Sequence, residues 1–486
     1  MQHAGFVDGV MVEGRGETLV VQDPSTEEEF ARFSGLSPEQ VEAAILAARA
    51  AYDSGSWSAK PTAERAEILR RFVAALEARR DRLADLIARE AGCPRHSASM
   101  TSQVAVPLRQ MPEVIDLFLS LPEAEDNPLP LDHRVTAQGS TVQSFKLYAS
   151  IGVVSAIAAY NFPFLTALWK VVPALIAGNT VVLRPSPLTP LSALVLGEAA
   201  AEAGLPAGVL NIVLEPGLEG GRLMSTHPAV DMVTFTGSSG VGVQIAQQAA
   251  PTMKRVQLEL GGKSAQIFLP DRVDLAARMA AVVCTSHAGQ GCALGTRLFV
   301  PEDRKAEVIE QIAREFAAIR VGPTDDAQTQ LGPVISAGQR DRCAHFVELA
   351  VANGGRVVAG GKRPAHLDKG FFFEATVLDV PDNSNPAAQE EIFGPVVTLI
   401  GYRDLDHAVA MANDSKFGLS GFVHGQDRAT ALKVGRAIKT GTVNVNAGIM
   451  SSYISAGGQR MSGLGRERGV EGLRIYQQLG CLNLGG

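Results

Sequence analysis

The stretch from residue 256 to residue 297 decides the fold. It opens with VQLELGGKSAQIF (256–268) and closes with SHAGQGCALGTR (286–297). Alternating apolar residues before Glu259 indicate a β-strand that ends at a Gly-Gly turn. Glycines on both sides of Gln290 let the backbone bend freely just before Cys292. The spacing between Glu259 and Cys292 leaves room for a loop, one helix and a return, so we predict that both side chains face one cleft.

Glu259 and Cys292 are residue types suited to acyl chemistry. A cysteine thiolate is a strong nucleophile where its surroundings lower its pKa. A carboxylate nearby can activate water to hydrolyse what the sulfur has captured. Because Glu259 stands between Leu258 and Leu260, we expect partial desolvation that raises its pKa towards a useful range. We expect buried, unreactive thiols at the other cysteines, Cys93, Cys284, Cys343 and Cys481.

Upstream of this stretch, apolar segments alternate with helical ones, which is typical of a parallel sheet covered on both faces. The GxGxxG fingerprint of many dinucleotide-binding folds is absent. Instead, residues 235–238 (FTGS) lead from a strand into a helix and bring backbone N–H groups towards a diphosphate. The expected strands are Val153–Ile157, Thr180–Leu183, Val209–Val213, Met232–Phe235 and Val256–Leu260, and the expected helices include Ser192–Ala203 and Val241–Ala250.

A second alternating region extends from Gly261 to about Thr440. Its expected strands lie near Arg297–Val300, Val396–Leu399 and Gly421–Val423. At the N-terminus we predict a hairpin within residues 6–22, an amphipathic helix at Pro38–Asp53 and one longer helix at Pro61–Ala91.

Composition limits the function. The chain has 486 residues, of which 46% are apolar and 20% charged, and its formal net charge is −7 at pH 7. Nucleic acid or an anionic membrane requires a basic surface, so neither is an expected partner. Five scattered cysteines without a CxxC motif form no disulfide framework, which favours a reducing, cytoplasmic location. Nine histidines without paired ligand spacing predict no metal site.

No targeting or membrane segment is expected. The N-terminus has no basic segment followed by an apolar run, so we predict no signal peptide. The uncharged stretch Leu147–Trp169 is long enough to cross a bilayer. Gly152, Asn161 and Pro163 interrupt it, and its first half is typical of a buried strand, so we do not interpret it as membrane-spanning.

Several motifs in one order resemble the aldehyde dehydrogenase superfamily. LELGGK (258–263) precedes GQGC (289–292), and the chain also carries YNFPF (160–164), FTGSSGVG (235–242), EEIFGPV (390–396) and SGLGRERG (462–469). The resemblance covers about Phe6 to Leu484. It implies an α/β fold with two doubly wound parallel-sheet domains and a small β oligomerisation arm. The implied parts are a dinucleotide-binding domain (1–130 and 150–259), a catalytic domain (260–440) and the arm (131–149 and 470–486).

The resemblance also implies catalytic roles. Cys292 is expected to be the nucleophile and Glu259 the general base. The side-chain amide of Asn161 and the backbone N–H of Cys292 are expected to form the oxyanion hole. Lys170 and Glu467 match positions that form a proton exit route behind Glu259. A structural ion pair is the alternative for these last two residues.

The expected cofactor is NAD, with NADP as an alternative. The family often has a Lys and, three residues on, a Glu that grips the adenine ribose, whereas this chain has Arg184 and Pro187. Arg184 could therefore pair with the 2′-phosphate of NADP. The positions matching the cofactor site are Ile157, Ala158, Tyr160, Arg184, Ser186, Gly217, Gly237, Ser238, Val241, Leu260, Glu391 and Phe393.

The expected substrate is a bulky, apolar aldehyde. The matching tunnel residues are uncharged, and Ile449, Tyr453 and Ile454 beside them are apolar or aromatic. Ala456 stands where the family commonly has an aromatic ring, which implies a wider tunnel. The tunnel positions are Phe162, Thr166, Trp169, Gly291, Ala293, Met450 and Ala456.

Two other functions stay open, a CoA-acylating dehydrogenase and a non-catalytic structural relative. Glu259 speaks against the first, because hydrolysis competes with CoA when a base is present. Intact Cys292, Glu259 and Asn161 speak against the second. The resemblance also predicts a homodimer or homotetramer, since an unpaired strand edge at the C-terminal tail is a template for pairing with another chain.

Overall fold

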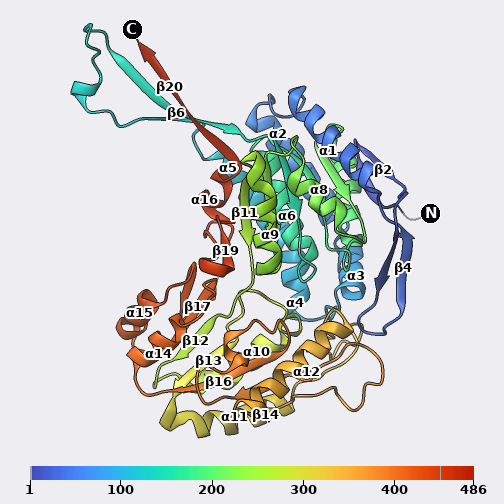
Figure 1. Cartoon of the computed structure of the whole chain (residues 1–486), viewed down its shortest axis with the longest axis vertical. Helices are drawn as coiled ribbons and strands as arrows, with labels where there is room; N and C mark the ends of the chain where they lie inside the picture. The colour runs from blue at the N-terminus through green and yellow to red at the C-terminus, as the bar shows by residue number, and fades with distance from the viewer. Residues whose placement is uncertain (1–2, 449, 486) are drawn as a thin grey trace.

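The structure is a computed structural model that describes residues 3–448 and 450–485. Two large, mostly parallel sheets form two lobes, and a narrow β-arm projects away from the first lobe (Figure 1). The predicted α/β class, with two doubly wound sheets and a small arm, agrees with this architecture. In the described ranges no helix is long and apolar enough to cross a bilayer.

The first sheet reverses its strand order near its middle, between β7 and β10. Its strand order is β19-β11-β10-β7-β8-β9-β1-β2. The chain runs outward from β7 to β9 on one side and from β10 to β11 on the other, so a crevice opens between β7 and β10. The parallel strands are β7 (Val153–Ile157), β8 (Thr180–Arg184), β9 (Leu210–Val213), β10 (Met232–Thr236) and β11 (Arg255–Glu259), and the antiparallel edges are β1 (Gly5–Val7), β2 (Val10–Val12) and β19 (Gly463–Leu464).

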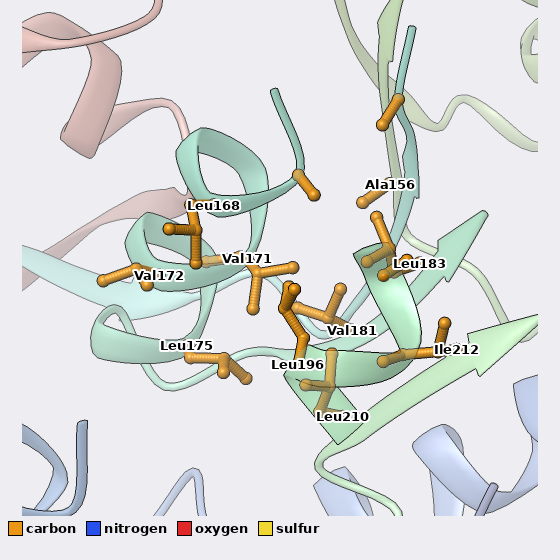
Figure 2. Packing of buried hydrophobic residues seen from close by; sticks show 14 of the residues in the cluster. Ala156, Leu168, Val171, Val172, Leu175, Val181, Leu183, Leu196, Leu210 and Ile212 are labelled. Carbon is orange, nitrogen blue, oxygen red and sulfur yellow. The ribbon is translucent and has the colours of Figure 1, made fainter. Parts of the chain in front are cut away.

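Two helical layers cover this sheet. One contains α1 (Pro38–Asp53), α8 (Glu219–Thr226) and α9 (Ser239–Ala249), and the other α2 (Thr62–Glu77), α5 (Val106–Leu119), α6 (Pro163–Ile176) and α7 (Leu191–Ala203). Every residue of β7 and β8 is buried, which explains why these strands are continuous apolar runs. Leucine and valine side chains of α6 and α7 pack onto β7, β8 and β9 in this core (Figure 2).

The second sheet carries the nucleophile loop. Its order is β14-β15-β16-β13-β12-β17-β18, and only β14 is antiparallel to its neighbour. Its strands are β12 (Ala265–Phe268), β13 (Arg297–Pro301), β14 (Arg356–Ala359), β15 (Thr376–Asp379), β16 (Val396–Tyr402), β17 (Ser420–His424) and β18 (Thr442–Val445). The helices around it are α10 (Ala276–Thr285), α11 (Lys305–Ala317), α12 (Ala337–Ala352), α14 (Leu405–Asn413) and α15 (Arg428–Ala437).

The arm is a three-stranded antiparallel sheet. It joins β5 (Ala124–Asp126), β6 (Val142–Ser150) and β20 (Gln477–Gly485), with β6 in the middle. It extends beyond the body of the molecule (Figure 1). Leu479, Leu482 and Leu484 of β20 are about half exposed, so the arm presents apolar side chains to solvent.

Two expectations for the N-terminal region are wrong. The hairpin ends at residue 12, where β1 pairs with β2, and β3 (Thr18–Gln22) pairs instead with β4 (Glu29–Ser34). The long helix at Pro61–Ala91 is two helices, α2 and α3 (Arg80–Glu90). Arg79 lies between the two helices, and its guanidinium donates to the carbonyl of Ala75 at 2.9 Å, which satisfies a C-terminal acceptor of α2.

One buried amide joins three distant segments. The Oδ1 atom of Asn179 accepts from the N–H groups of Ile151 at 2.7 Å and Gly152 at 3.0 Å. Its Nδ2 donates to the carbonyls of Ala174 at 3.0 Å and Tyr476 at 2.9 Å. Asn179 is fully buried, so all four bonds are formed away from water. The amide thus ties the start of β7 and the end of α6 to the C-terminal segment.

We expect Asn179→Ala to destabilise the protein by about 3 kcal/mol or more, because it leaves several buried backbone groups unpaired at roughly 1–3 kcal/mol each. Asn353→Ala is the matched control, since that exposed amide donates to the Leu349 carbonyl within its own helix end. Thermal melts should show a fall of several degrees for the first variant and little change for the second. Equal melting temperatures for Asn179→Ala and the parent would contradict the assignment.

Candidate active site

A cavity of about 470 Å³ lies at the crevice between β7 and β10, where residues of the second lobe close it. Ligands of open α/β sheets bind at such a switch point, outside the carboxyl ends of the strands. Asn161, Glu259 and Cys292 all line this space. So does every predicted cofactor residue except Gly217. The prediction that Glu259 and Cys292 face one cleft agrees with the structure.

The loop before Cys292 contains unusual backbone. His287, Ala288 and Gly289 have φ angles of 48°, 52° and 69°, all in the left-handed region. A Cβ at residue 289 would overlap the Gly394 carbonyl, so glycine is required there. The bend expected from the two glycines thus lies at residues 287–289.

Two contiguous glycines let the chain approach itself beside the nucleophile. A Cβ at Gly261 would overlap the Glu391 carboxylate, and one at Gly262 would overlap the backbone carbonyl of Cys292. The Gly262 N–H donates to Glu391 Oε1 at 2.8 Å. Burial raises the pKa of Glu391, and that N–H bond opposes the rise. The Gly-Gly turn therefore holds both Glu391 and the Cys292 backbone against the end of β11.

One of the two N–H donors of the Asn161 side-chain amide already makes a hydrogen bond within the protein. Its Nδ2 donates to the Gln290 carbonyl at 2.7 Å, and its own carbonyl accepts from Gln103 Nε2 at 2.7 Å. The residue is 5% exposed and lines the cavity. An amide nitrogen has two N–H donors, so the second can point at a bound oxygen. This is the arrangement that an oxyanion hole needs.

Glu259 is the last residue of β11, and its side chain lies in a buried cluster of charged side chains. Burial raises its pKa well above the ordinary value, and the charge of Glu467 adds to the rise, while Lys170 and Arg468 oppose it. Its Oε1 has no hydrogen-bond partner among the residues described. Lys170 Nζ is fully buried, and it donates to Glu467 Oε1 at 2.7 Å and to Thr234 Oγ1 at 3.2 Å. The predicted contact between Lys170 and Glu467 is present.

The other end of the cavity fits a diphosphate-linked nucleotide. Gly237 lies where a Cβ would overlap the ring of Phe235, and Ser238 caps α9 by accepting from the Val241 N–H. The first turn of α9 thus leaves N–H groups for phosphate oxygens. The Thr236 hydroxyl is buried and has no partner in the described chain. Across the cleft, Tyr160 and Phe393 meet edge to face at 5.9 Å between ring centroids.

Arg184 is not free, contrary to the expectation that it could pair with a 2′-phosphate. Its Nε donates to Glu215 Oε1 at 2.6 Å, and its Nη2 donates to the Gly217 carbonyl at 2.5 Å. Gly217 therefore orients Arg184 through its carbonyl, while Arg184, Ser186 and Pro187 line the cavity.

The comparisons with known proteins match this geometry. The profile of the Aldehyde dehydrogenase family matches residues 11–480. The chain belongs to the aldehyde dehydrogenase family. A geranial dehydrogenase from Castellaniella defragrans is 39% identical over 461 residues, which are 94% of this chain and 93% of that protein.

Solved aldehyde dehydrogenases share the fold. Aldehyde dehydrogenase C of Pseudomonas syringae, a cysteine-to-alanine variant in complex with NAD+ and octanal, superposes with a TM-score of 0.92 at 35% identity. The match covers 99% of this chain and 96% of that one. The Mycobacterium tuberculosis enzyme complexed with NAD+ gives 0.90 at 37% identity, covering 98% and 97%. These matches confirm the family and fold class that the motifs predicted.

In this aldehyde dehydrogenase the predicted tunnel residues come from three segments. Phe162 lies at the start of α6, and its ring meets the His287 ring at 5.4 Å. The Thr166 hydroxyl, predicted to face the tunnel, donates to the Phe162 carbonyl at 2.9 Å, so its hydrogen bond is made within the start of the helix. Trp169 is 2% exposed. Gly291 and Ala293 flank the nucleophile in the sequence. The Met450 side chain is about half exposed, and the backbone of Ala456 is hydrogen-bonded to that of Glu467. Ile449 lies outside the described residues.

Sequence reasoning missed three side chains of this site. Gln290 is fully buried; its Oε1 accepts from the Ile335 N–H at 3.0 Å, and its Nε2 donates to the His287 carbonyl at 3.3 Å. Gln103 holds Asn161, and the guanidinium carbon of Arg468 lies 5.8 Å from the centre of the Trp169 ring. The GQGC and GRERG motifs pointed to the neighbourhood of Gln290 and Arg468, whereas no sequence signal marked Gln103.

The electrostatics of Cys292 differ from the expectation of a lowered pKa. Burial raises the pKa of the Cys292 thiol to about 12, and the carboxylates of Glu391 and Glu259 add to this. The thiol is therefore neutral at neutral pH. Burial likewise raises the pKa of the Cys93, Cys284 and Cys343 thiols to about 12. Cys481 is exposed on the arm, so the expectation of a buried thiol there is wrong.

We expect alkylation of Cys292 by iodoacetamide in nucleotide-free enzyme to accelerate about tenfold per pH unit between pH 7 and pH 10. Only the thiolate reacts, and its fraction rises tenfold per unit below the pKa. Peptide mass mapping measures the alkylation rate at this residue, and Cys292→Ser checks that the modified peptide is assigned correctly. Free N-acetylcysteine is the reference, because the alkylation rate of an ordinary thiol levels off once the pH exceeds its pKa. A Cys292 rate that levels off below pH 9 would mean that its pKa is not raised.

Proposed function

We propose that the chain oxidises an aldehyde to the carboxylic acid with NAD, which it prefers to NADP, through a covalent intermediate on Cys292. One observation carries the proposal: Cys292, Glu259 and Asn161 line the same cavity as the groups suited to a dinucleotide. The relatives solved with NAD+ support this choice of cofactor. The net reaction converts an aldehyde, NAD+ and water into an acid, NADH and a proton.

The residues have successive roles. Glu259 takes the proton of the Cys292 thiol, and the sulfur attacks the carbonyl carbon to form a thiohemiacetal. Asn161 Nδ2 and the Cys292 N–H donate to its oxyanion. NAD, when bound, supplies the acceptor for the hydride that leaves this carbon. The carbon is then held as a thioester. Glu259 takes a proton from the water that attacks the thioester, and the acid departs as the thiol regains a proton.

Lys170 and Glu467 form the proposed route for the proton behind Glu259. The buried ammonium contacts Glu467 at 2.7 Å, and the charges of both residues act on the pKa of Glu259. Because burial raises that pKa, Glu259 ionises over a higher pH range than an exposed carboxyl, and it must lose its proton before it can act as a base. Deacylation should therefore quicken as pH rises.

The two competing functions are less well supported. A CoA-acylating enzyme gains nothing from a buried carboxylate poised to activate water. A structural relative has no need of strained backbone at residues 287–289, which positions a nucleophile. Turnover of an aldehyde panel with and without CoA, followed as NADH absorbance, separates all three.

The proposed substrate is a bulky, apolar aldehyde. Phe162 contributes a partly exposed aromatic ring beside the nucleophile loop, and each buried CH₂ of a substrate contributes about 0.8 kcal/mol. The relatives named for geranial and complexed with octanal support this class. One observation favours a second candidate, an aldehyde that carries a carboxylate: the Arg468 guanidinium lies over Trp169, where such a group could pair with it.

We expect kcat/KM to rise from acetaldehyde to octanal and citral, and to stay low for succinic semialdehyde. Ala456→Phe should lower kcat/KM for the bulky aldehydes by roughly tenfold, because the ring fills the space they occupy, and should spare acetaldehyde. Arg468→Leu is the companion variant; because the Arg468 charge also lowers the pKa of Glu259, the quantity compared is the ratio of kcat/KM for octanal to that for the semialdehyde. A best rate with the semialdehyde, lost in Arg468→Leu, would favour the second candidate instead.

We expect Glu259→Gln to show a burst of NADH followed by a slow steady state, because the amide cannot activate water while hydride transfer still proceeds. Intact mass should reveal the trapped acyl-enzyme. Cys292→Ala is the control that should give neither burst nor adduct. A Glu259→Gln variant with the parent's steady-state rate would point to another base.

The assembly and the division into domains stay predictions. We propose that residues 1–130 and 150–259 bind the dinucleotide, 260–440 hold the nucleophile, and 131–149 with 470–486 join subunits into a homodimer or homotetramer. The half-exposed leucines of β20 support an interface on the arm. The predicted reducing, cytoplasmic location stays a prediction too. No cluster of metal-ligating residues occurs in the described ranges.

A further inference from the structure

We propose that Glu215 excludes a 2′-phosphate from the adenosine end of the cavity and so makes this chain select NAD over NADP. The inference rests on the proposed function, since it concerns the cofactor end of the same cleft. It assigns the selectivity to a residue that follows β9, whereas the motif comparison looked for a carboxylate at Pro187, which follows β8.

The sheet brings the two charged residues together. Arg184 is the last residue of β8, and Glu215 follows the end of β9 by two residues. These strands are parallel neighbours, with Leu183 opposite Ile212. Their carboxyl ends therefore meet at the edge where ligands of this fold bind. The Arg184 and Glu215 side chains are 8% and 5% exposed and are joined by a 2.6 Å contact.

Glu215 also occupies the N-terminus of a helix. Its Oε2 accepts from the Gly220 N–H and its Oε1 from the Gly221 N–H, each at 2.8 Å. Both N–H groups belong to the first turn of α8, a position that favours anions. A Cβ at Gly220 would lie 2.6 Å from Glu215 Oε2, so the missing side chain admits the carboxylate.

The carboxylate thus uses both features that could bind a 2′-phosphate. The Arg184 guanidinium is the obvious cationic partner, but Glu215 and the Gly217 carbonyl hold it. The α8 N–H groups are the obvious neutral donors, and Glu215 accepts from them as well. A phosphate with nearly two negative charges would have to displace a buried carboxylate that repels it. A ribose hydroxyl carries no charge and meets no such repulsion.

A purely structural ion pair predicts something different. In that case a change at Glu215 alters stability and the affinity for both nucleotides alike. If Glu215 selects the nucleotide, its removal changes the ratio of the two affinities, because the freed guanidinium can pair with the phosphate. The ratio of dissociation constants is therefore the decisive quantity.

The test measures Kd for NAD and NADP by titration calorimetry, without turnover, on the parent, Glu215→Gln and a matched control. The control is Glu219→Gln, which removes the same charge from an exposed position four residues away. We expect the parent to bind NADP at least about tenfold more weakly than NAD. Glu215→Gln should improve the NADP/NAD affinity ratio by about tenfold or more, and Glu219→Gln should leave it unchanged. The double variant Arg184→Gln/Glu215→Gln should lose the gain.

A second measurement needs no variant and covers the case in which Glu215→Gln does not fold. The parent should bind 5′-AMP at least about tenfold more tightly than 2′,5′-ADP, since these ligands differ in the 2′-phosphate alone. Equal affinities for the two ligands, or an unchanged NADP/NAD ratio in folded Glu215→Gln, would overturn the role of Glu215. A parent that binds neither NAD nor NADP would instead overturn the proposed function, so the two failures are distinguishable.

Discussion

The backbone carbonyl of Cys292 lies against Gly262 with no side chain between them, and the active site depends on this close approach. Gly262 lies between β11 of the first sheet and β12 of the second, so the contact sits at the junction of the lobes. In the same turn, the Gly262 N–H donates a hydrogen bond to the Glu391 carboxylate. Any side chain at this point would push the nucleophile loop away from the strand that carries Glu259.

Much of the scaffold around this junction follows from local sequence. The strands β7, β8, β10 and β11 and the helices α1 and α7 lie within a residue or two of their predicted bounds, because fully apolar runs and helical periodicity are strong local signals. Glu259 and Cys292 could be paired because their spacing fits one strand, one helix and a return. For the individual cofactor and tunnel positions, the sequence offered only a match of motifs.

The errors have two physical causes, which are local contacts that hydrophobic periodicity does not reveal and contacts between residues distant in the sequence. The continuous helical pattern at Pro61–Ala91 hid the break after α2, where the Arg79 side chain satisfies a carbonyl of the preceding helix. β3 pairs with β4, which follows it in the chain, and not with the strand before it as the predicted hairpin required. Burial reversed the expected shift of the Cys292 pKa, and burial of one residue depends on the whole fold. The roles of Glu215 and Gln103 could not be predicted either, because their hydrogen-bond partners Arg184 and Asn161 lie far from them in the sequence.

The short strand β19 has a consequence for the order of biosynthesis. It is the edge of the first sheet, yet its residues 463 and 464 emerge from the ribosome after the entire second sheet. Glu467, which neutralises the buried Lys170 ammonium, belongs to the same late segment. A nascent chain that has completed β11 thus exposes an open strand edge, and Lys170 lacks its ion-pair partner, until residues 463–467 are synthesised. Vectorial folding of the first lobe is therefore incomplete while the second lobe forms.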